Sequence, residues 1–556
     1  MNQMGFLPYL AAMKFVFTSL VLLIGLVSGG CHLRAADWAQ DGGNAQRTGY
    51  TTEEPLMPWK SAWSWNGPDA KGGSGNHRYH QPAPHEPWEA RVCAGGGYVF
   101  APAGAQGLYA LKTTDGSVAW QFKGGTCHAT PALDASNGLV YVGTQEGTLH
   151  QLEVASGRER AVHHVGAPLT KSLLLVPGRV IALTAKGGLH CMETRTLRLM
   201  WTYEAGSPAA ALPAYSASRD SVIFVTEDLT VHSVNMGKSA GRWKVKPTTL
   251  TPQDGVEFTG GWPVVAERHG IVFVRLVHRN CDATIWSGGG PKGRWPTTNE
   301  AIRQRLLEQP RYKNLFALSL DDGKEVFVPN VGPAGVEDME GDKPRLRAHC
   351  FPVIKEVDGH EVAYIAWRNG DTQDATWDAR WDSHLGEMVL DDETVPGLEA
   401  GDLRFVQSTE HGGWMRITDE SCPLTMAGSV IFHSHWDACT AVQITDRTTA
   451  LGLARALPIK TTWLPPVARH IKLAPAAVDT ATHWTRGNLQ LMDGRSLPGP
   501  GWWVYANELD PPTPARSAYS EGILPRYAIV AGGLVIIQGN GGELFVLRHA
   551  GKQETP

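Results

Sequence analysis

Three side chains in the stretch HSHWDAC (433–439) are of the types that bind divalent metal ions. His433, His435 and Asp437 alternate along the chain, and alternating residues of a β-strand point to the same side of a sheet. Two imidazoles and a carboxylate on one side would form a metal site. Alignment with similar hairpins of this chain places Asp437 across a turn, where strict alternation fails. Ordinary polar turn residues are therefore the alternative interpretation.

A second group of ionisable side chains precedes prolines that open short apolar strands. Imidazoles and carboxylates that converge on a partly buried site could bind a metal ion or exchange protons with a ligand. Alternatively, they satisfy backbone groups of the loops in which they lie. The group consists of His85, His128, His349, Asp419 and Glu420.

Four tryptophans lie in two segments that break the regular pattern of the chain. Trp377 and Trp381 belong to TWDARWDSH, and Trp502 and Trp503 belong to GPGWWVYANELDPP. Exposed tryptophan rings could stack on a sugar or on a flat cofactor. The alternative is that they anchor these loops to the rest of the fold.

The elements that position these residues are short strands. The chain has 62 glycines and 36 prolines and almost no amphipathic helical pattern, which favours many strands joined by tight turns. Its 50 basic and 55 acidic residues nearly balance, without a long basic run, so a nucleic-acid-binding face is excluded.

The hairpin LYALKTTDGSVAW (108–120) is one of eight copies, two of them split by insertions. Intact copies recur about every 40 residues, the length of a four-stranded propeller blade. A short strand precedes each hairpin and an aromatic-bearing strand follows several, as in VAWQF, LMWTY and GRWKV. This unit of strands A, B, C and D predicts an all-β, eight-bladed β-propeller. KSAWSWNG (60–67) is expected to supply strand D of the last blade and to close the ring.

The first hairpin resembles the docking motif of PQQ-like propeller repeats in Ala110-Leu111, Asp115-Gly116 and Trp120. The segment DWAQDGGNAQRTGY (37–50) resembles the entry segment of these propellers. This resemblance to the quinoprotein-type superfamily, and within it to BamB-like exported propellers, covers residues 37–550. It implies the fold but not the function, because the superfamily contains both dehydrogenases and non-catalytic assembly proteins.

Three insertions fall in B–C turns or D–A connections, which share one face of a propeller. They cover residues 277–312, with the helical pattern TTNEAIRQRLLEQP, residues 371–385 and residues 452–526. Long loops on a rigid scaffold are common binding elements. We expect a binding site on this face, and the alternative is that the loops only cover the pore.

The N-terminus has the pattern of an export signal. Lys14 precedes the apolar run FVFTSLVLLIGLVSGG (15–30), and translation could also start at Met13. We assign residues 1–36 to this segment and 37–556 to one propeller domain. Two forms of processing compete, lipidation of Cys31 and cleavage in LRAADW after Ala35, and the second is favoured. A location in the periplasm or cell envelope is expected.

One favoured function and two alternatives follow from these patterns. No PQQ or calcium ligand, vicinal cysteine pair or CxxCH motif is recognisable, which favours a non-catalytic, monomeric scaffold that binds a protein or a cell-envelope glycan. The first alternative is a PQQ- and calcium-dependent dehydrogenase of an alcohol or sugar. The second is a polysaccharide hydrolase or lyase that uses paired carboxylates.

Overall fold

The structure is a computed structural model, and its described residues belong to one compact unit, Ala36–Pro556. Within that unit no described helix is long and apolar enough to cross a membrane. The described residues are 36–56, 59–65, 90–258, 261–278, 299–331, 336–340, 343–347, 351–357, 359–368, 383–395, 397–408, 423–435, 438–444, 468–473, 477–479, 484–491, 496–503, 525–539 and 544–549.

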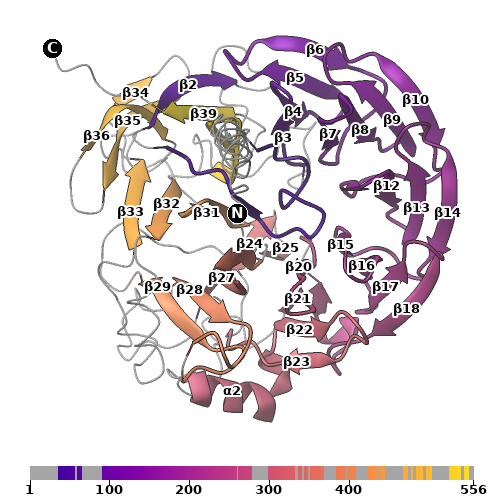
Figure 1. The fold of residues 1–556 in the computed structure, drawn as a ribbon, viewed down its shortest axis with the longest axis vertical. Helices are drawn as coiled ribbons and strands as arrows, with labels where there is room; N and C mark the ends of the chain where they lie inside the picture. Colours follow the sequence, from indigo (N-terminus) through magenta and orange to yellow (C-terminus); the bar gives the residue numbers. More distant parts are fainter. Residues whose placement is uncertain are drawn as a thin grey trace, which may run out of the picture. The chain divides into compact units, whose positions relative to one another are not determined.

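Eight antiparallel sheets follow one another along the chain as the predicted blades, with strand A nearest the centre and strand D at the periphery (Figure 1). The middle strands are almost wholly buried, whereas the outer strands alternate between exposed and partly buried residues, as expected for sheet edges. Blades 1 to 4 comprise β3 (Cys93–Gly95), β4 (Tyr98–Pro102), β5 (Leu108–Lys112) and β6 (Val118–Phe122); β7 (Ala132–Asp134), β8 (Leu139–Gly143), β9 (Thr148–Glu153) and β10 (Glu159–His164); β11 (Leu174–Val176), β12 (Arg179–Leu183), β13 (Gly188–Glu193) and β14 (Leu199–Glu204); and β15 (Ala214–Ser216), β16 (Ser221–Val225), β17 (Val231–Asn235) and β18 (Ala240–Val245).

The last four blades repeat this order, and blade 8 takes its fourth strand from the N-terminal part of the chain. The predicted closure is thereby confirmed, because β2 pairs with β39. Blades 5 to 8 comprise β20 (Val264–Ala266), β21 (Ile271–His278), β22 (Leu315–Ser319) and β23 (Glu325–Phe327); β26 (Val353–Val357), β27 (His360–Arg368), β28 (Ser383–Val389) and β29 (Leu403–Ser408); β30 (Thr425–Ala427), β31 (Val430–His435), β32 (Ala438–Ile444) and β33 (Ala468–Leu473); and β37 (Pro525–Ala531), β38 (Leu534–Gly539), β39 (Leu544–His549) and β2 (Trp59–Trp65).

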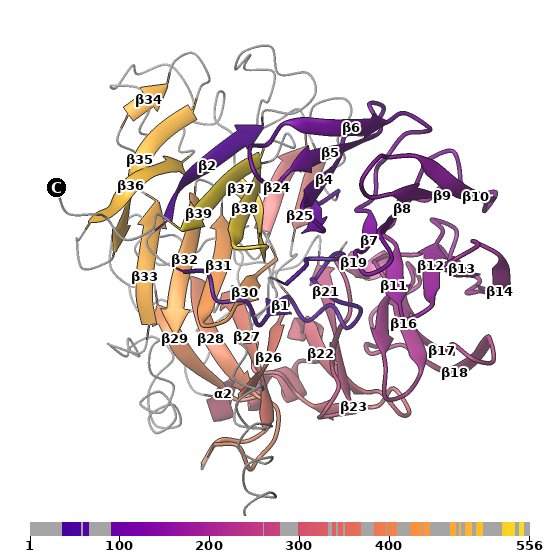
Figure 2. The ribbon, with the colours of Figure 1, turned by 45° about the horizontal axis from the view of Figure 1, so that its top comes forward.

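The other elements extend the blades or connect them. The hairpin β24–β25 lies in the connection between blades 5 and 6, and Figures 1 and 2 place it over the middle of the ring. These elements are β1 (Tyr50–Thr51), parallel to β30; β19 (Val256–Phe258), paired with β21; β24 (Val336–Glu340) and β25 (Lys343–Arg347); β34 (Ala477–Asp479), β35 (Trp484–Leu491) and β36 (Ser496–Trp503), which continue the sheet of blade 7; the helix α2 (Asn299–Glu308); and the 3₁₀ turns η1 (Pro252–Asp254) and η3 (Pro310–Tyr312).

The helix in residues 277–312 and one strand in residues 452–526 do not lie over the pore. The predicted helix in residues 277–312 forms as α2, but it lies at the outer rim of blades 5 and 6 (Figure 1). Asn299 fixes it there, because its amide donates to the Leu403 carbonyl (2.7 Å) and accepts from the Leu403 N–H (2.9 Å). Within residues 452–526, strand β33 pairs with β32 as the fourth strand of blade 7.

The blades are joined by tryptophans on their outer strands. Trp120 of blade 1 donates its indole N–H to the Val154 carbonyl of blade 2 (2.8 Å), in the turn between strands C and D. Gly157 in this turn has a φ of 70°, and a Cβ there would lie 2.6 Å from the indole. The same bond joins Trp63, Trp201 and Trp243 to blades 1, 4 and 5. The predicted docking role of these tryptophans is therefore confirmed.

The junction between blades 2 and 3 is built differently. Ala161 pairs with Gln151 in the register in which Trp120 pairs with Ala110, so alanine occupies the docking position. Leu197 is buried in the cluster against which Ala161 packs; it is 2% exposed and adopts a left-handed φ of 53° where the turns of blades 1, 2 and 5 have glycine and that of blade 4 has Ser239. The hydrogen bond is supplied instead by Tyr141, whose hydroxyl donates to the carbonyl of Thr194 (2.9 Å).

Replacing Ala161 with tryptophan is expected to destabilise the protein by about 1–3 kcal/mol, because Leu197 already fills the docking space. The double variant A161W/L197G should recover most of that loss, since it restores the tryptophan–glycine pair found for Trp63, Trp120 and Trp243. Thermal unfolding of the two variants provides the measurement. If A161W alone is as stable as the parent protein, the docking space at this junction is not filled as described.

Candidate functional site: the central channel

Residues 36–54, here called the strap, run along the innermost strands of all eight blades. The strap backbone bonds blade 1 through Trp38 and Ala94, which exchange two hydrogen bonds of 2.7 and 3.0 Å. Near its end, the strap forms the short strand β1, which pairs in parallel with β30 of blade 7. The blade residues that donate to strap oxygens are Leu133 (to Ala39), Leu175 (to the Gln40 side chain), Tyr215 (to Ala45), Val265 (to Gln46), Ile354 (to Thr48), Met426 (to Gly49) and Gly532 (to Ala36).

Carboxylates of the strap bind the A–B turns of the blades. Glu54 accepts from the backbone N–H of Ser429 in blade 7 (2.7 Å), and Glu53 accepts from Gly532 (3.2 Å) and Gly533 in blade 8. Asp37 accepts from Gly96 in blade 1 at 3.3 Å. Because A–B and C–D turns share one face, the strap closes the channel on the face opposite the B–C turns. We call this face the strap face.

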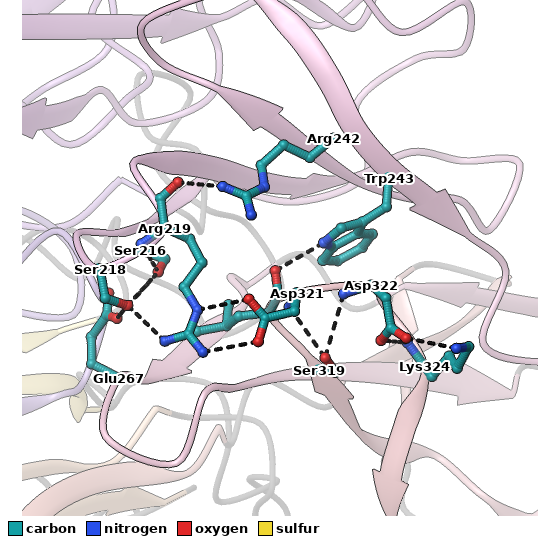
Figure 3. Close-up of polar contacts among 11 residues, drawn as sticks. Ser216, Ser218, Arg219, Arg242, Trp243, Glu267, Ser319, Asp321, Asp322 and Lys324 are labelled. Carbon is teal, nitrogen blue, oxygen red and sulfur yellow. Dashed lines mark hydrogen bonds and ion pairs between the residues drawn. The ribbon is translucent and has the colours of Figure 1, made fainter.

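The same device joins neighbouring blades on the strap face, as Figure 3 shows for blades 4 and 5. Glu267 of blade 5 accepts from the hydroxyls of Ser216 (3.1 Å) and Ser218 (2.5 Å) in the A–B turn of blade 4. Arg219 of that turn forms a bidentate pair with Asp321 of blade 5, with distances of 3.1 and 3.0 Å. Charged side chains on this face therefore hold adjacent blades together.

At the junction of blades 5 and 6, His269 lies between two carboxylates. Its Nδ1 is 3.1 Å from Glu361 and its Nε2 is 2.8 Å from Asp391. The hydrogen bond with Glu361 is the main cause that raises the pKa of His269, partial burial lowers it, and the bond with Asp391 adds to the rise. The protonated imidazole is thus the form that this junction stabilises.

A His269→Gln variant should lose more stability relative to the parent at about pH 5.5 than at about pH 8.5. The folded-state pKa is raised above its ordinary value of 6.5, so the contribution of His269 is complete below that value and is lost as pH rises through the folded-state pKa. The difference in Tm between the two proteins across this pH range measures it. A difference that grows with rising pH would contradict the assignment.

The centre of the channel is filled by the protein's own side chains. Arg47 of the strap is fully buried and donates to the backbone carbonyls of Pro213 (2.9 Å), Asp41 (2.6 Å) and Leu173 (3.0 Å). Burial lowers the pKa of Arg47 to about 10, although Asp41 opposes this effect. The guanidinium remains charged at neutral pH, and it ties the strap to blades 3 and 4.

Arg91, just before strand A of blade 1, is the second buried cation of the channel. Its guanidinium carbon lies 5.0 Å from the ring of Trp262 and 5.4 Å from that of Tyr527, and its Nη1 is 3.6 Å from an Asp41 carboxylate oxygen. Trp38 packs edge-on against Tyr527, with ring centroids 6.4 Å apart. Blades 1, 5 and 8 thus meet the strap around one cation held by two aromatic rings.

Several buried polar atoms of this cluster have no hydrogen-bond partner among the protein atoms. Within the described part of the chain they are the indole N–H of Trp38 and both carboxylate oxygens of Asp41. Buried donors and acceptors without a direct partner can be bridged by a water molecule, because water both donates and accepts hydrogen bonds. Burial, together with the Asp41 carboxylate, also raises the pKa of Tyr527 above its usual range, so its hydroxyl keeps its proton.

The structure places only some of the residues singled out in the sequence. His128 lies in the connection before β7; it is partly buried, burial lowers its pKa, and its Nδ1 has no hydrogen-bond partner among the described residues. His433 and His435 lie on β31, which ends at His435, and β32 begins at Ala438. The remaining residues lie outside the described part of the chain, or have side chains outside it: His85, His349, Trp377, Trp381, Asp419, Glu420, Asp437, Trp502 and Trp503.

The channel residues Asp41, Arg47 and Arg91 were not predicted. The predicted residues lie just before the prolines that open the A strands, whereas Arg91 follows the proline of its blade, Pro87, and lies between it and strand A. The signal that would have found Asp41 and Arg47 is their occurrence as charged residues within DWAQDGGNAQRTGY, a segment expected to enter the ring. Charges placed there must be paired or bonded to backbone groups.

PQQ and calcium do not fit the described part of the channel. A flat quinone needs an aromatic surface, and at the centre Arg91 lies over the rings of Trp262 and Tyr527, while Phe351 stacks with Trp262 and Trp38 packs edge-on against Tyr527. Calcium needs six or more oxygen ligands. The carboxylate at this centre, Asp41, stands beside Arg91 and is close enough to Arg47 to affect its pKa. Among the described residues, no group of three or more acidic, histidine or cysteine side chains is arranged to hold a metal ion.

Comparisons with known proteins agree with the repeat pattern. Residues 129–328, which contain blades 2 to 5, match the family described as outer membrane protein assembly factor BamB. The expected resemblance to PQQ-like propeller repeats is thereby confirmed. No protein among curated sequences matches the chain.

Three solved structures resemble the fold at low sequence identity. BamB from Moraxella catarrhalis is 10% identical, with a TM-score of 0.42, and the likeness covers 84% of this chain and 96% of that one. The computationally designed protein Ika8 is 11% identical, with a TM-score of 0.43 and coverages of 88% and 99%. A europium-containing methanol dehydrogenase is 11% identical, with a TM-score of 0.44 and coverages of 79% and 90%.

Proposed function

We propose that this protein is an exported, non-catalytic scaffold of the cell envelope that binds a protein partner on the face of the B–C turns and D–A connections. The observation that supports this most is the filled channel. Arg47, Arg91, Trp38 and Tyr527 are buried together at the centre, so a ligand there would have to displace a buried ion pair and two aromatic rings. A binding role for the loops around the channel mouth requires no such displacement.

The two faces differ in a way that favours the loop-bearing side. The strap face is engaged by its own contacts, because strap carboxylates and blade-to-blade ion pairs already use its turns. The B–C and D–A face carries the connections in which the insertions occur. A protein partner is favoured over a glycan because the matched family is described as an assembly factor.

Site-specific photocrosslinking in the exporting cell tests this assignment. A crosslinkable residue at Lys186 or Glu227, in B–C turns of blades 3 and 4, should give crosslinks to one defined partner. The same residue at Thr196 or Lys238, in C–D turns of these blades, should give none. Crosslinks from the C–D positions alone would contradict the proposed face.

A PQQ titration separates the scaffold from the dehydrogenase. Purified protein is mixed with PQQ and calcium while tryptophan fluorescence is followed, and dye-linked oxidation of alcohols and aldoses is assayed in parallel. We expect neither saturable binding nor turnover. Saturable micromolar binding with turnover would replace the scaffold with a quinoprotein dehydrogenase.

A further inference from the structure

The first described residue of the strap, Ala36, contacts blade 8 directly through its carbonyl, and its nitrogen bonds the strap carboxylate Glu53, which itself binds blade 8. Its nitrogen donates to the Glu53 carboxylate (2.9 Å), and its carbonyl accepts from Gly532 (3.2 Å). The compact unit of the protein begins at this residue. Ala36 is also the residue that would follow the favoured cleavage site after Ala35.

Glu53 is well placed to hold a positive charge. Its carboxylate accepts from the N–H groups of Gly532 (3.2 Å) and Gly533, which fix it in the A–B turn between β37 and β38. These are neutral donors, and among the described residues no cationic side chain pairs with this carboxylate. Within the uncut chain, Ala36 supplies one more neutral amide hydrogen to the same carboxylate.

We propose that the peptide bond between Ala35 and Ala36 is a processing site, and that the α-ammonium group released at Ala36 forms an ion pair with Glu53 that anchors the strap. Hydrolysis adds one water: the carbonyl carbon of Ala35 takes the hydroxyl, and the nitrogen of Ala36 takes the hydrogen. At neutral pH the proton of the new carboxyl moves to the amine. A hydrogen bond from a neutral amide to a carboxylate thereby becomes an ion pair between two opposite charges.

The inference deepens the proposed function, because it rests on export of the chain. A membrane-bound peptidase that selects small residues before the cut is the class of enzyme required. The cut residue is the start of a segment that bonds all eight blades. Cleavage would therefore strengthen the contact by which the first residues of the folded protein hold the last blade.

The N-terminus of the full-length chain, expressed in an exporting bacterial host, is identified first by intact mass and terminal sequencing. We expect a chain that starts at Ala36. A lipidated chain starting at Cys31, or one starting at Asp37, would overturn the inference while leaving export intact. A chain retained uncut in the cytoplasm would overturn the inference together with the exported scaffold.

The ion pair is tested by a cycle of four proteins: chains starting at Ala36 or at Leu33, each with Glu53 or with E53Q. The longer start moves the ammonium three residues away and keeps the Ala36 amide. In the proteins that retain Glu53, we expect the chain that starts at Leu33 to show about fivefold faster hydrogen exchange, in the peptide containing Gly532 and Gly533, than the chain that starts at Ala36. In the two E53Q proteins, we expect the same exchange rate for both starts. Equal effects in both backgrounds would overturn the ion pair.

E54Q provides the matched control, because Glu54 is the neighbouring strap carboxylate but binds blade 7. Lengthening the N-terminus should still accelerate exchange of the blade 8 peptide in E54Q. If E54Q abolishes the effect as E53Q does, the coupling comes from general loosening of the strap and the ion pair is refuted.

Discussion

Replacing Arg47 with methionine is expected to lower the free energy of unfolding by about 3–5 kcal/mol. Three buried carbonyl groups, of Pro213, Asp41 and Leu173, would lose their donor, and Asp41 would lose a compensating charge nearby. Methionine matches the length of the arginine stem, so the loss reports mainly on the guanidinium. Denaturant unfolding followed by tryptophan fluorescence provides the measurement.

Arg198→Met is the control for this prediction. Arg198 lies on the surface with its side chain 66% exposed, and its nearest carboxylate contact, with Glu193, is 3.9 Å long. Its replacement should change the free energy of unfolding by less than about 0.5 kcal/mol. Similar losses for the two variants would mean that the guanidinium of Arg47 is not the element that joins strap and blades.

Trp63→Ala is expected to cost about 3–5 kcal/mol and to open the seam between blades 8 and 1. The Trp63 side chain is 7% exposed, packs over Gly116 and donates to the Thr113 carbonyl at 2.9 Å. Because β2 is the only strand of its blade that comes from the N-terminal side, its docking holds the ring closed. Thermal unfolding and limited proteolysis of the variant measure both effects.

Trp65→Ala, two residues along the same strand, gives the comparison. Trp65 is only partly buried and contacts Tyr109 with ring centroids 5.4 Å apart. We expect a loss of about 1 kcal/mol and no new proteolytic cleavage at the seam. A loss as large as that of Trp63→Ala would show that burial of any aromatic ring, and not docking, stabilises this edge.

The repeated strands could be predicted because the pattern that specifies a blade lies within the sequence of that blade. Apolar strands, tight turns and, in several blades, a tryptophan on the outer strand lie close together in sequence, so local periodicity was sufficient to predict the eight blades and β2. Position 161 is instructive in the same way. In the sequence, alanine at this position shows only that the docking tryptophan is absent. The structure shows that Leu197 and Tyr141 replace its packing and its hydrogen bond.

The channel could not be predicted in the same manner. Arg47 and Arg91 acquire their roles from residues of blades 3, 4, 5 and 8, which lie more than 100 positions away in the chain, and Asp41 acquires its role from these two arginines. No periodicity relates such partners, and their neighbours in sequence are ordinary loop residues. Whether the histidines and carboxylates chosen near the A-strand prolines bind a ligand stays a prediction.

The strap also governs when the protein can finish folding during its synthesis. Glu53 and Gly533, which bond each other, are 480 positions apart. The first residues of the strap must therefore wait, without part of their hydrogen-bond partners, until the last hairpin has been made. If translation stops before blade 8, β2 and Glu53 lack their partners in that blade. The unpaired strand edges of such a chain are then exposed to proteases. Completion of the polypeptide is thereby linked directly to its survival.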